Sequence, residues 1–584
     1  MRYHALATDY DGTIAHHGGV DDETLAALER FRGSGRKLIM VTGREMPELA
    51  TVFPRLDLFE WIVAENGALL YRPSNQESTL IGEPPPARFV EELKRRGVQR
   101  ISVGGVIVAT WEPFENTVLA VIRDLGLELK VIFNKGAVMV LPTSINKASG
   151  LTVALSRMGL SPHEVVGVGD AENDHAFLSI CECSAAVANA LPAVKERADI
   201  VLERDHGGGV TDLINGVLAD ELKHMHRHVR RHQILLGHRA DGSDVRINPY
   251  GGAVLIAGPS GSGKSTVATA LVERLAELGY QHAVIDPEGD FATLEGAVIL
   301  GGSNQAPAVD EVMQVLKNPK GNVVANLIGV ALPDRPTTFQ TLLSRMLEMR
   351  AATGRPHWVL IDEAHHLLPT AWAPTTLNLP QELNRLILVT VHPGEVSPAV
   401  LEMVKLVIAV GPKPREVVEQ FCQATGADLP PPAEASPSAD YVFAWSRETH
   451  EQFYVKPVRC RSEHRRHIRK YMEGELPPDR SFYFRGPESK LNLRAQNLGL
   501  FMQTADGIDD DTWTFHLGRG DVAQWFDIAI KDRELVEEAA AVQKADLSPR
   551  ESRARIRAAI EKRYTLPATS YLPMPGTDNK PKAK

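Results

Sequence analysis

The chain has 584 residues, 43% of them hydrophobic and 24% charged, and a formal net charge of -10 at pH 7. This composition is typical of a globular protein, and at roughly 150 residues per domain the length predicts three or four domains. The acidic balance disfavours indiscriminate nucleic-acid coating, and four scattered cysteines exclude a disulfide scaffold. Because there is neither an apolar leader nor a run of ~18 apolar residues, we expect a cytoplasmic protein with no membrane partner.

Two carboxylates end the first apolar run of the sequence. Asp9 and Asp11 follow a short buried-strand pattern, and Gly12 and Thr13 come directly after them. Alternate residues of an extended chain face the same side, so the two carboxylates can serve one site, and glycine lets the backbone turn there. Two acids this close repel each other unless a cation or a shared proton lies between them. Taken alone, these residues are equally well explained as a solvated acidic turn.

Three further segments place this acidic pair in a larger pattern. A second apolar run ends in Thr42, Gly43 and Arg44, Lys147 closes the segment 144–147, and residues 170–174 follow a third apolar run. In this order the four segments resemble the motifs of the haloacid dehalogenase (HAD) phosphatases. The resemblance implies a Rossmann-like α/β core with catalytic groups at the carboxyl ends of parallel strands.

The resemblance also implies a role for each residue. Asp9 would be the nucleophile that forms an aspartyl-phosphate, and Asp11 would be the general acid and base. Thr42 and Lys147 would bind the phosphoryl oxygens and neutralise the charge that develops on them. Further phosphate-binding positions are Gly43 and Asn173. Mg²⁺ prefers oxygen ligands, and its expected ligands are Asp9, Asp11, Asp170 and Asp174.

An insertion separates the second motif from the third. Glu65, Asn66 and Gly67 before it, and the run 138–142 at its end, resemble the Cof-like branch of this family. Residues 68–143 are therefore expected to form an α/β cap that would close over the substrate and exclude water. The core would then comprise residues 1–67 and 144–225. A capped site shuts out polymers, so the expected partner is a small phosphorylated metabolite such as a sugar phosphate. Arg44 could join the site or form a structural ion pair.

A second unit, residues 226–457, is expected after a basic run at residues 223–232. That run is better explained as a solvated linker than as a metal site. A buried-strand pattern and an amphipathic helix then flank a phosphate-binding loop, whose backbone N–H groups would cradle ATP. Lys264 would reach the β and γ phosphates, and Ser265 would coordinate Mg²⁺. The expected loop residues are Gly258, Pro259, Ser260, Gly261, Ser262, Gly263, Lys264, Ser265 and Thr266.

Another apolar strand of this unit ends in Asp362 and Glu363. Asp362 would bind the Mg²⁺ water shell and Glu363 would polarise the attacking water, which favours an ATP hydrolase over a kinase. Residues 286–290 and the strand before His392 resemble the HerA/FtsK group of P-loop ATPases, which are commonly hexameric motors. His392 stands where many relatives carry glutamine and is the expected γ-phosphate contact. Candidate arginine fingers for a neighbouring subunit are Arg385 and Arg415.

Residues 458–566 are expected to form a small mixed α+β unit, and the Pro- and Lys-rich residues 567–584 a disordered tail. The basic run 459–470 could contact phosphates, although a solvated face is the commoner explanation. The expected core residues are Phe482, Tyr483, Phe484, Trp513, Phe515, Trp525 and Phe526. Polar residues without an assigned mechanism are Arg485, Asn492, Arg494, His516 and Asp521.

The leading hypothesis is therefore an α/β protein in which a Mg²⁺-dependent phosphatase is fused to an ATP-hydrolysing unit. In one alternative the ATPase is a nucleic-acid motor and the phosphatase is accessory; in another, ATP binding is a switch that gates phosphatase activity or assembly. Salt-sensitive DNA binding would favour the motor. The ATPase resemblance implies a homo-oligomer, a hexamer, and leaves nucleic acid open as a partner.

Overall fold

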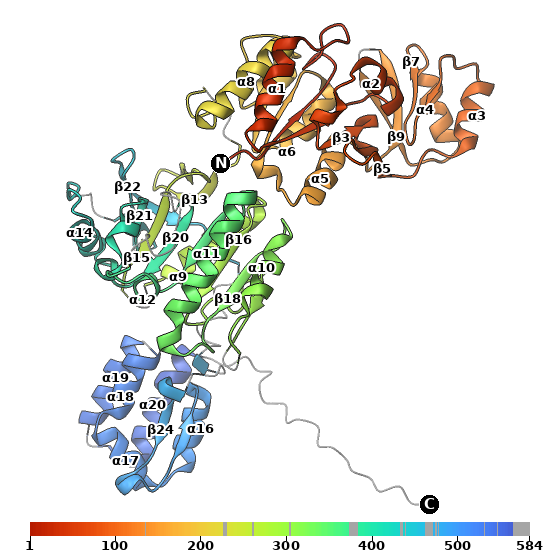
Figure 1. Ribbon diagram of the computed structural model, residues 1–584. Helices are drawn as coiled ribbons and strands as arrows, with labels where there is room; N and C mark the ends of the chain where they lie inside the picture. The colour runs from red at the N-terminus through yellow and green to blue at the C-terminus, as the bar shows by residue number, and fades with distance from the viewer. Residues whose placement is uncertain are drawn as a thin grey trace, which may run out of the picture.

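The computed structural model describes residues 1–134, 136–225, 231–259, 262–302, 305–372, 384–432, 436–438, 440–461, 471–472, 476, 478–530, 532–545 and 547–564. They form three bodies that follow one another in space as in sequence (Figure 1). Predictions that fall outside the described residues concern Ser260, Gly261, 226–230, 462–470 and the tail 567–584. Among the described helices, none is long and apolar enough to cross a bilayer.

The first body is built on an eight-stranded sheet in the order β12-β11-β10-β1-β2-β3-β4-β5. The strands from β12 to β3 in that order are parallel, and β4 and β5 join the edge antiparallel. The strands are β1 (Ala5–Thr8), β2 (Lys37–Val41), β3 (Trp61–Ala64), β4 (Leu69–Arg72), β5 (Glu77–Leu80), β10 (Val165–Gly169), β11 (Cys183–Ala186) and β12 (Ile200–Val201). The helices are α1 (Asp22–Gly33), α2 (Met46–Val52), α5 (Lys147–Met158), α6 (His175–Ile180), α7 (Pro192–Arg197) and α8 (His206–Asp220). The central strands are apolar throughout because both of their faces are buried.

The cap is a separate antiparallel sheet of four strands in the order β6-β7-β9-β8. Its elements are β6 (Ser102–Val103), β7 (Val108–Trp111), β8 (Leu129–Asn134), β9 (Ala137–Pro142), α3 (Ala87–Arg95) and α4 (Glu115–Asp124). Strands β4 and β5 hydrogen-bond to the core sheet, although the insertion is expected to begin at residue 68. The division into domains therefore stays a proposal.

The middle body contains an eleven-stranded sheet in the order β14-β13-β23-β22-β21-β15-β20-β19-β16-β18-β17. The seven strands from β21 to β17 are parallel, and the other four are antiparallel. The strands are β13 (Ile234–His238), β14 (Asp244–Ile247), β15 (Ala253–Ala257), β16 (His282–Asp286), β17 (Val298–Leu300), β18 (Val323–Asn326), β19 (Trp358–Ile361), β20 (Leu386–Thr390), β21 (Val404–Ala409), β22 (Val442–Ser446) and β23 (Gln452–Pro457). The helices are α9 (Lys264–Glu277), α10 (Val309–Lys317), α11 (Arg335–Thr353), α12 (Ala364–Leu367), α13 (Pro398–Leu401) and α14 (Pro414–Thr425).

The third body is mainly helical around a two-stranded sheet, so the expected small α+β unit is present. Its elements are β24 (Phe482–Phe484), β25 (Leu493–Ala495), α16 (Leu498–Gly507), α17 (Asp510–Gly518), α18 (Asp521–Trp525), the π-helix η11 (Phe526–Ile530), α19 (Arg533–Lys544) and α20 (Pro549–Arg563). Five of the seven expected aromatic core residues are buried together. Tyr483 and Phe515 differ, because their rings remain half-buried at the surface.

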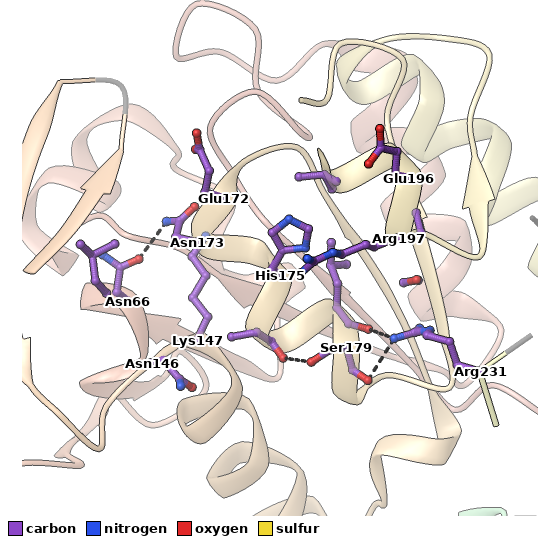
Figure 2. Close-up of a pocket in the computed structure, with 16 residues that line it drawn as sticks. Asn66, Asn146, Lys147, Glu172, Asn173, His175, Ser179, Glu196, Arg197 and Arg231 are labelled. Atoms are coloured by element: carbon purple, nitrogen blue, oxygen red, sulfur yellow. Dashed lines mark hydrogen bonds between the residues drawn. The ribbon is translucent and has the colours of Figure 1, made fainter. Parts of the chain in front are cut away.

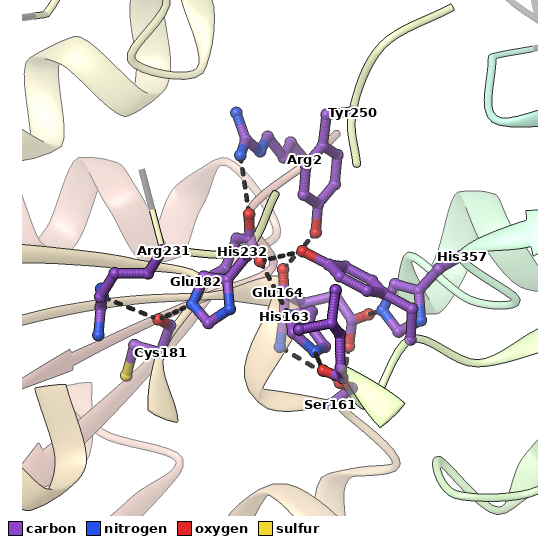
Figure 3. Close-up of polar contacts among 12 residues, drawn as sticks. Arg2, Ser161, His163, Glu164, Cys181, Glu182, Arg231, His232, Tyr250 and His357 are labelled. Atoms are coloured by element: carbon purple, nitrogen blue, oxygen red, sulfur yellow. Dashed lines mark hydrogen bonds and ion pairs between the residues drawn. The ribbon is translucent and has the colours of Figure 1, made fainter. Parts of the chain in front are cut away.

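The first two bodies meet at a polar junction formed by the amino ends of their strands (Figure 3). Arg2, His163 and Glu182 lie just before β1, β10 and β11, whereas Tyr250 and Tyr280 lie just before β15 and β16. Glu182 accepts hydrogen bonds from Arg2 at 3.0 Å and Tyr280 at 2.8 Å, and its Oε2 is 2.8 Å from Nδ1 of His163. Because active groups of such sheets follow the carboxyl ends, the two catalytic edges point away from each other.

The charges at this junction compensate one another. Nε2 of His163 is 2.8 Å from the carbonyl oxygen of Leu278, so both ring nitrogens face oxygen acceptors. Burial alone would raise the pKa of Glu182, but the hydrogen bond and charge of His163 and the charge of Arg2 lower it to about 2. Ligand atoms of His163, Glu182 and His232 lie within 4.8 Å of one another. Since Glu182 already has three donors, we interpret the group as an ion-pair cluster rather than a metal site.

The end of the basic linker is docked rather than solvated. Arg231 lies 2.6 Å from Asp199 and donates to the carbonyl oxygens of Leu178, Ser179 and Cys181. The expectation of a solvated run therefore fails at this residue, because the guanidinium finds acceptors at the end of α6 and just before β12.

Candidate active sites

Parallel strands bring the acidic groups of the first body to one edge of its sheet. Asp9 follows β1 and Asp170 follows β10, and the in-register pair Thr8 and Val168 puts both carboxylates at the same level. Thr42 follows β2 on the other side of β1. All three side chains are buried, so their charges and hydrogen bonds act in a medium of low dielectric constant.

Lys147 pairs with two carboxylates at the centre of this edge. It is the first residue of α5, where Asn146 caps the helix by accepting the Ser149 N–H. Its Nζ lies 2.6 Å from Oδ1 of Asp9 and 2.6 Å from Oδ1 of Asp174. Burial and the charge of Asp174 raise the pKa of Asp9 to about 8, although Lys147 acts in the opposite direction. The lysine therefore compensates part of a buried negative charge.

The remaining negative charge fits a hard cation. Ligand oxygens of Asp9, Asp170 and Asp174 lie within 4.8 Å of one another, and the single positive charge of Lys147 pairs with two of these three carboxylates. Asp174 is fixed because its Oδ2 accepts the N–H groups of Asp170 and Ala171 at 2.9 Å. An all-oxygen set held in this way suits Mg²⁺.

Asp11 is turned toward Arg44. Nε and Nη2 of Arg44 lie 2.6 and 2.7 Å from the two carboxylate oxygens. Of the two alternatives for Arg44, the structure thus contains the ion pair. Its partner is Asp11, the expected general acid and base. The Asp11 carboxylate does not belong to the three-carboxylate group, and its side chain is 38% exposed.

Two residues beside the site carry contacts that sequence reasoning did not assign. Asn66 accepts a 2.9 Å hydrogen bond from Asn173 (Figure 2). The Asn66 side chain also lies beside Gly43, and its backbone N–H donates to the carbonyl oxygen of Thr42. Glu65 accepts the N–H groups of residues 105, 106 and 107 in the cap at 2.8, 2.8 and 3.0 Å. A signal was available, because Glu65 and Asn66 belong to the segment that marks the start of the cap.

A cavity of about 770 Å³ adjoins the Asn66–Asn173 pair. Lys147, Arg197 and Arg231 line it together with Glu172 and Glu196, so its charged lining is mixed, and burial lowers the pKa of His175, which also lines it (Figure 2). Such a cavity has the size of a small-molecule site.

The expected nucleotide loop of the middle body follows β15 and opens α9. Gly258 has to be glycine because a Cβ there would lie 2.0 Å from the carbonyl oxygen of Val410. Gly263 caps the helix with φ 99°, a conformation that glycine adopts without strain. Lys264 is buried and donates to the carbonyl oxygen of Pro259 at 2.9 Å. Ser265 and Thr266 lie in the first turn of α9.

Carboxylates gather opposite this loop. Asp362 follows β19, and burial together with Asp290, Glu363, Asp286 and Glu288 raises its pKa well above the usual range. Asp286 instead organises the backbone, because its carboxylate accepts the N–H groups of residues 288, 289, 290 and 291. Excess negative charge beside a phosphate-binding loop fits a Mg²⁺–nucleotide complex.

Glu363 has neighbours that the sequence did not indicate. Nδ1 of His365 lies 3.5 Å from Glu363 Oε2 and 3.1 Å from Thr390 Oγ1. The backbone N–H of His392 also donates to Thr390 Oγ1 at 3.1 Å. His365 and Thr390 thus connect the expected water-polarising carboxylate to the strand end that carries His392.

The two arginine-finger candidates have other contacts. Arg385 precedes β20 at the junction, 5.3 Å from the ring of Tyr250, and thus lies at the sheet edge opposite to the nucleotide loop. Arg415 is held by Glu419 and by the carbonyl oxygen of Pro430. Both arginines are therefore engaged within their own chain, and the finger role of either stays a prediction.

Comparison with known proteins finds a matching family for each of the first two bodies. Residues 6–98 and 114–214 match the haloacid dehalogenase-like hydrolase family, and residues 243–389 match the AAA ATPase domain. Phosphoglycolate phosphatase of Methanothermobacter thermautotrophicus is 32% identical over 221 residues, which cover 36% of this chain and 96% of that protein. The chain belongs, through its first body, to the haloacid dehalogenase-like hydrolases, and its middle body carries an AAA ATPase domain.

Two further matches cover the same body. Phosphoglycolate phosphatase 2 of Saccharolobus solfataricus is 28% identical over 220 residues, covering 37% of this chain and 92% of that protein. The crystal structure of a haloacid dehalogenase-like hydrolase from Bacteroides thetaiotaomicron is 18% identical with a TM-score of 0.33, covering 37% of this chain and 99% of that one.

Proposed function

We propose that the first body is a Mg²⁺-dependent phosphatase that hydrolyses a small phosphorylated metabolite, and that the middle body binds and hydrolyses ATP. The phosphatase assignment rests on the position of Lys147, which is buried between Asp9 and Asp174, with the carboxylate of Asp170 beside them. Asp9, Asp170 and Asp174 would hold Mg²⁺, which supplies positive charge to the phosphoryl oxygens when it is bound.

The reaction would proceed through two displacements at phosphorus. A carboxylate oxygen of Asp9 forms a bond to phosphorus while the bond to the leaving oxygen breaks, and Asp11 gives that oxygen a proton. Asp11 then takes a proton from a water, whose oxygen displaces Asp9 and releases inorganic phosphate. Thr42 and Lys147 stabilise the charge on the transferred group.

The substrate we infer is a small phosphorylated acid or sugar. Support comes from the cavity of small-molecule size that Lys147 and Arg197 line beside the acidic edge, and from a cap that would limit access. The relatives carry the name phosphoglycolate phosphatase, so phosphoglycolate is the first candidate to test and sugar phosphates follow. Fold likeness by itself does not determine the substrate.

For the middle body we infer a HerA/FtsK-like ATPase. In this assignment Lys264 and Ser265 bind the phosphates and Mg²⁺, Asp362 supports the metal, and Glu363 polarises water. The loop built on Asp286 is the feature that supports this group over other AAA relatives. A hexamer and a nucleic-acid substrate remain parts of the proposal that assembly and DNA-binding measurements test.

The test is phosphate release in the presence of Mg²⁺ from phosphoglycolate, sugar phosphates, nucleotides and ATP, with and without DNA. Asp9→Asn should abolish hydrolysis of the monoester and spare that of ATP, whereas Lys264→Ala should do the reverse. Unchanged monoester hydrolysis in Asp9→Asn would refute the phosphatase assignment. ATP hydrolysis that rises with DNA would favour the motor over the switch.

A further inference from the structure

The C-terminal body contains a cavity of about 610 Å³ that neither proposed active site uses. Its walls come from β24, the turn that follows, α17, α18 and η11. We call it the C-terminal cleft. Part of its lining consists of polar residues that the sequence singled out without a mechanism: Arg485, His516 and Asp521.

Guanidinium groups stand beside aromatic rings in this cleft. Arg485 lies 5.6 Å from the ring centroid of Tyr483, and Arg519 lies 5.1 Å from that of Phe515. Both arginines are exposed and both rings are half-buried, so a ligand can reach them. Arginine binds phosphate oxygens through two parallel donors, and aromatic faces stack on nucleobases. The pairing of these two residue types matches the two parts of a nucleotide.

The frame of the cleft is fixed by His516. Its Nε2 accepts the backbone N–H groups of Arg485 and Gly486 at 2.9 and 3.2 Å, and its Nδ1 donates to Asp521 at 2.8 Å. Since Nε2 accepts, the ring is neutral with its proton on Nδ1. Gly486 has φ 70°, and a Cβ there would lie 2.7 Å from Thr512 Oγ1. The turn that carries Arg485 is therefore held in one conformation.

The lining carries three arginines, Arg480, Arg485 and Arg519, and two acids, Glu488 and Asp521. Because Arg480 pairs with Glu288 outside the cleft, the charges of the lining are close to balanced. Asp521 is already engaged, because it accepts from His516 at 2.8 Å and lies 3.6 Å from Arg519. A single phosphate suits this balance better than a long polyanion.

One wall of the cleft touches the nucleotide edge of the middle body. Nη2 of Arg480 lies 2.8 Å from Oε1 of Glu288, a buried residue of the loop that Asp286 organises. The carbonyl oxygen of Arg480 accepts from Trp525 Nε1 at 2.8 Å, and Trp525 also lines the cleft. Through Glu288, Arg480 is connected to the carboxylates that surround Asp362.

We infer that the C-terminal cleft binds a nucleotide unit, with its phosphate on Arg485 and Arg519 and its base against Tyr483 or Phe515, and that Arg480 connects occupancy of the cleft to the ATP site. The same chemistry is offered by a free mononucleotide and by one nucleotide of a single strand. The connection to the ATP site rests on the proposed ATPase function, whereas binding in the cleft does not.

Binding is tested in the full chain with Asp9→Asn and Lys264→Ala together, so that neither proposed active site consumes the probe. The probes are AMP, a short oligo(dT) and inorganic phosphate, followed by quenching of tryptophan fluorescence, which Trp525 should report. AMP or oligo(dT) should bind, and adding Arg485→Glu and Arg519→Glu should weaken binding at least tenfold. Arg550→Glu, at an exposed arginine of the same body outside the cleft lining, is the matched control and should bind as before.

The outcomes distinguish a free nucleotide from a single strand as the ligand, and they include the results that would refute the inference. Binding of AMP identifies a free nucleotide as sufficient, and binding of oligo(dT) alone identifies a strand. If inorganic phosphate binds as tightly as both nucleotide probes, or if Arg485→Glu with Arg519→Glu binds them unchanged, the inference is wrong. Milder Arg485→Gln with Arg519→Gln, checked by thermal melting, excludes a folding defect as the cause of weak binding.

Coupling is measured as the change that the bound probe causes in the affinity for a fluorescent ATP analogue, with the P-loop intact. The change should be present in the chain carrying only Asp9→Asn and absent when Arg480→Gln is added, and by linkage the analogue should change probe affinity by the same factor. Equal coupling with and without Arg480→Gln overturns the proposed connection. Failure of the analogue to bind would refute the ATPase proposal while leaving the cleft result standing.

Discussion

Arg44 holds the carboxylate of Asp11 with two donors at 2.6 and 2.7 Å, at the rim of the acidic site. The same guanidinium also pairs with Glu48. Asp11 is therefore oriented by a residue of the second motif rather than by the metal-binding group. This pairing gives Arg44 a positioning role.

Arg44→Gln should lower kcat of the phosphatase by about ten- to a hundredfold with little change in KM, because a charge-assisted hydrogen bond contributes about 1.5–3 kcal/mol. Steady-state kinetics on the best monoester measures both constants. Arg55→Gln, which removes an exposed ion pair of the same body, is the control. A rise in KM with kcat unchanged would show that Arg44 binds substrate instead.

Lys147→Met should destabilise the first body by about 3–5 kcal/mol, because it leaves the buried carboxylates of Asp9 and Asp174 without their cation. Added Mg²⁺ should recover part of this loss and raise the Tm of the variant more than that of the wild type. Thermal melting with and without Mg²⁺ measures the difference, and Lys94→Met at an exposed lysine is the control. Equal melting of Lys147→Met and wild type without Mg²⁺ contradicts the account.

The raised pKa of Glu164, a residue at the junction, predicts that the stability of the protein depends on pH. Burial raises its pKa from 4.5 to about 7, so the folded state binds the proton more tightly than the unfolded state does. Its contribution is fully present below the unfolded pKa of about 4.3 and is lost as pH rises through about 7, a change of roughly 3 kcal/mol. The Tm of wild type minus that of Glu164→Gln should therefore fall between about pH 5 and about pH 8.

The contacts of Glu164 explain why the amide is the right replacement. Its Oε2 accepts the Ser161 N–H at 2.6 Å, and its Oε1 lies 2.6 Å from Nε2 of His357, whose Nδ1 accepts the Gln281 N–H. Glutamine does not titrate, but it keeps only one of these two acceptors, so the pH dependence of the Tm difference is the readout rather than its size. Glu203→Gln, at an exposed glutamate, should give a flat difference. Parallel Tm profiles of wild type and Glu164→Gln would count against the raised pKa.

Thr390→Val should slow ATP hydrolysis about tenfold without changing KM for ATP, since it removes the hydroxyl that contacts His365 and accepts from the His392 N–H. Valine has nearly the same shape, so the fold should be kept. Thr341→Val, at an exposed helical threonine, is the matched control. A rate equal to that of the wild type would exclude the proposed connection from Thr390 to Glu363.

Much of the α/β architecture could be predicted, because strand patterns followed by motif residues place those residues at carboxyl ends. The grouping of Asp9, Lys147 and Asp174 depends on this rule and on the order of the motifs. The Arg44–Asp11 pair could only be left as an alternative, because sequence spacing does not say which acid a guanidinium meets. Tyr483 and Phe515 were expected in the core because aromatic composition does not distinguish buried rings from rings that line a cleft.

The junction could not be predicted from the sequence. Arg2, His163, Glu182 and Tyr280 are far apart in the chain and belong to no motif, and each looks like an ordinary surface residue beside a strand. They meet only because both sheets present their amino ends to each other. Long-range contacts of this kind carry no local pattern that periodicity or spacing could reveal.

The two sheets meet at the amino ends of their strands, and this arrangement argues against direct transfer of a product between the two active sites. The sheet edges that follow β1 and β15 and carry the two candidate sites lie away from the junction, so a product of one site would not pass directly to the other and would have to diffuse through bulk water. The shortest strand between the junction and the ATP site is β19, which links His357 to Asp362 over about 13 Å at ~3.3 Å per residue and pairs with β16 on one side and β20 on the other. A strand clamped on both sides resists sliding, which insulates each reaction from small movements at the other.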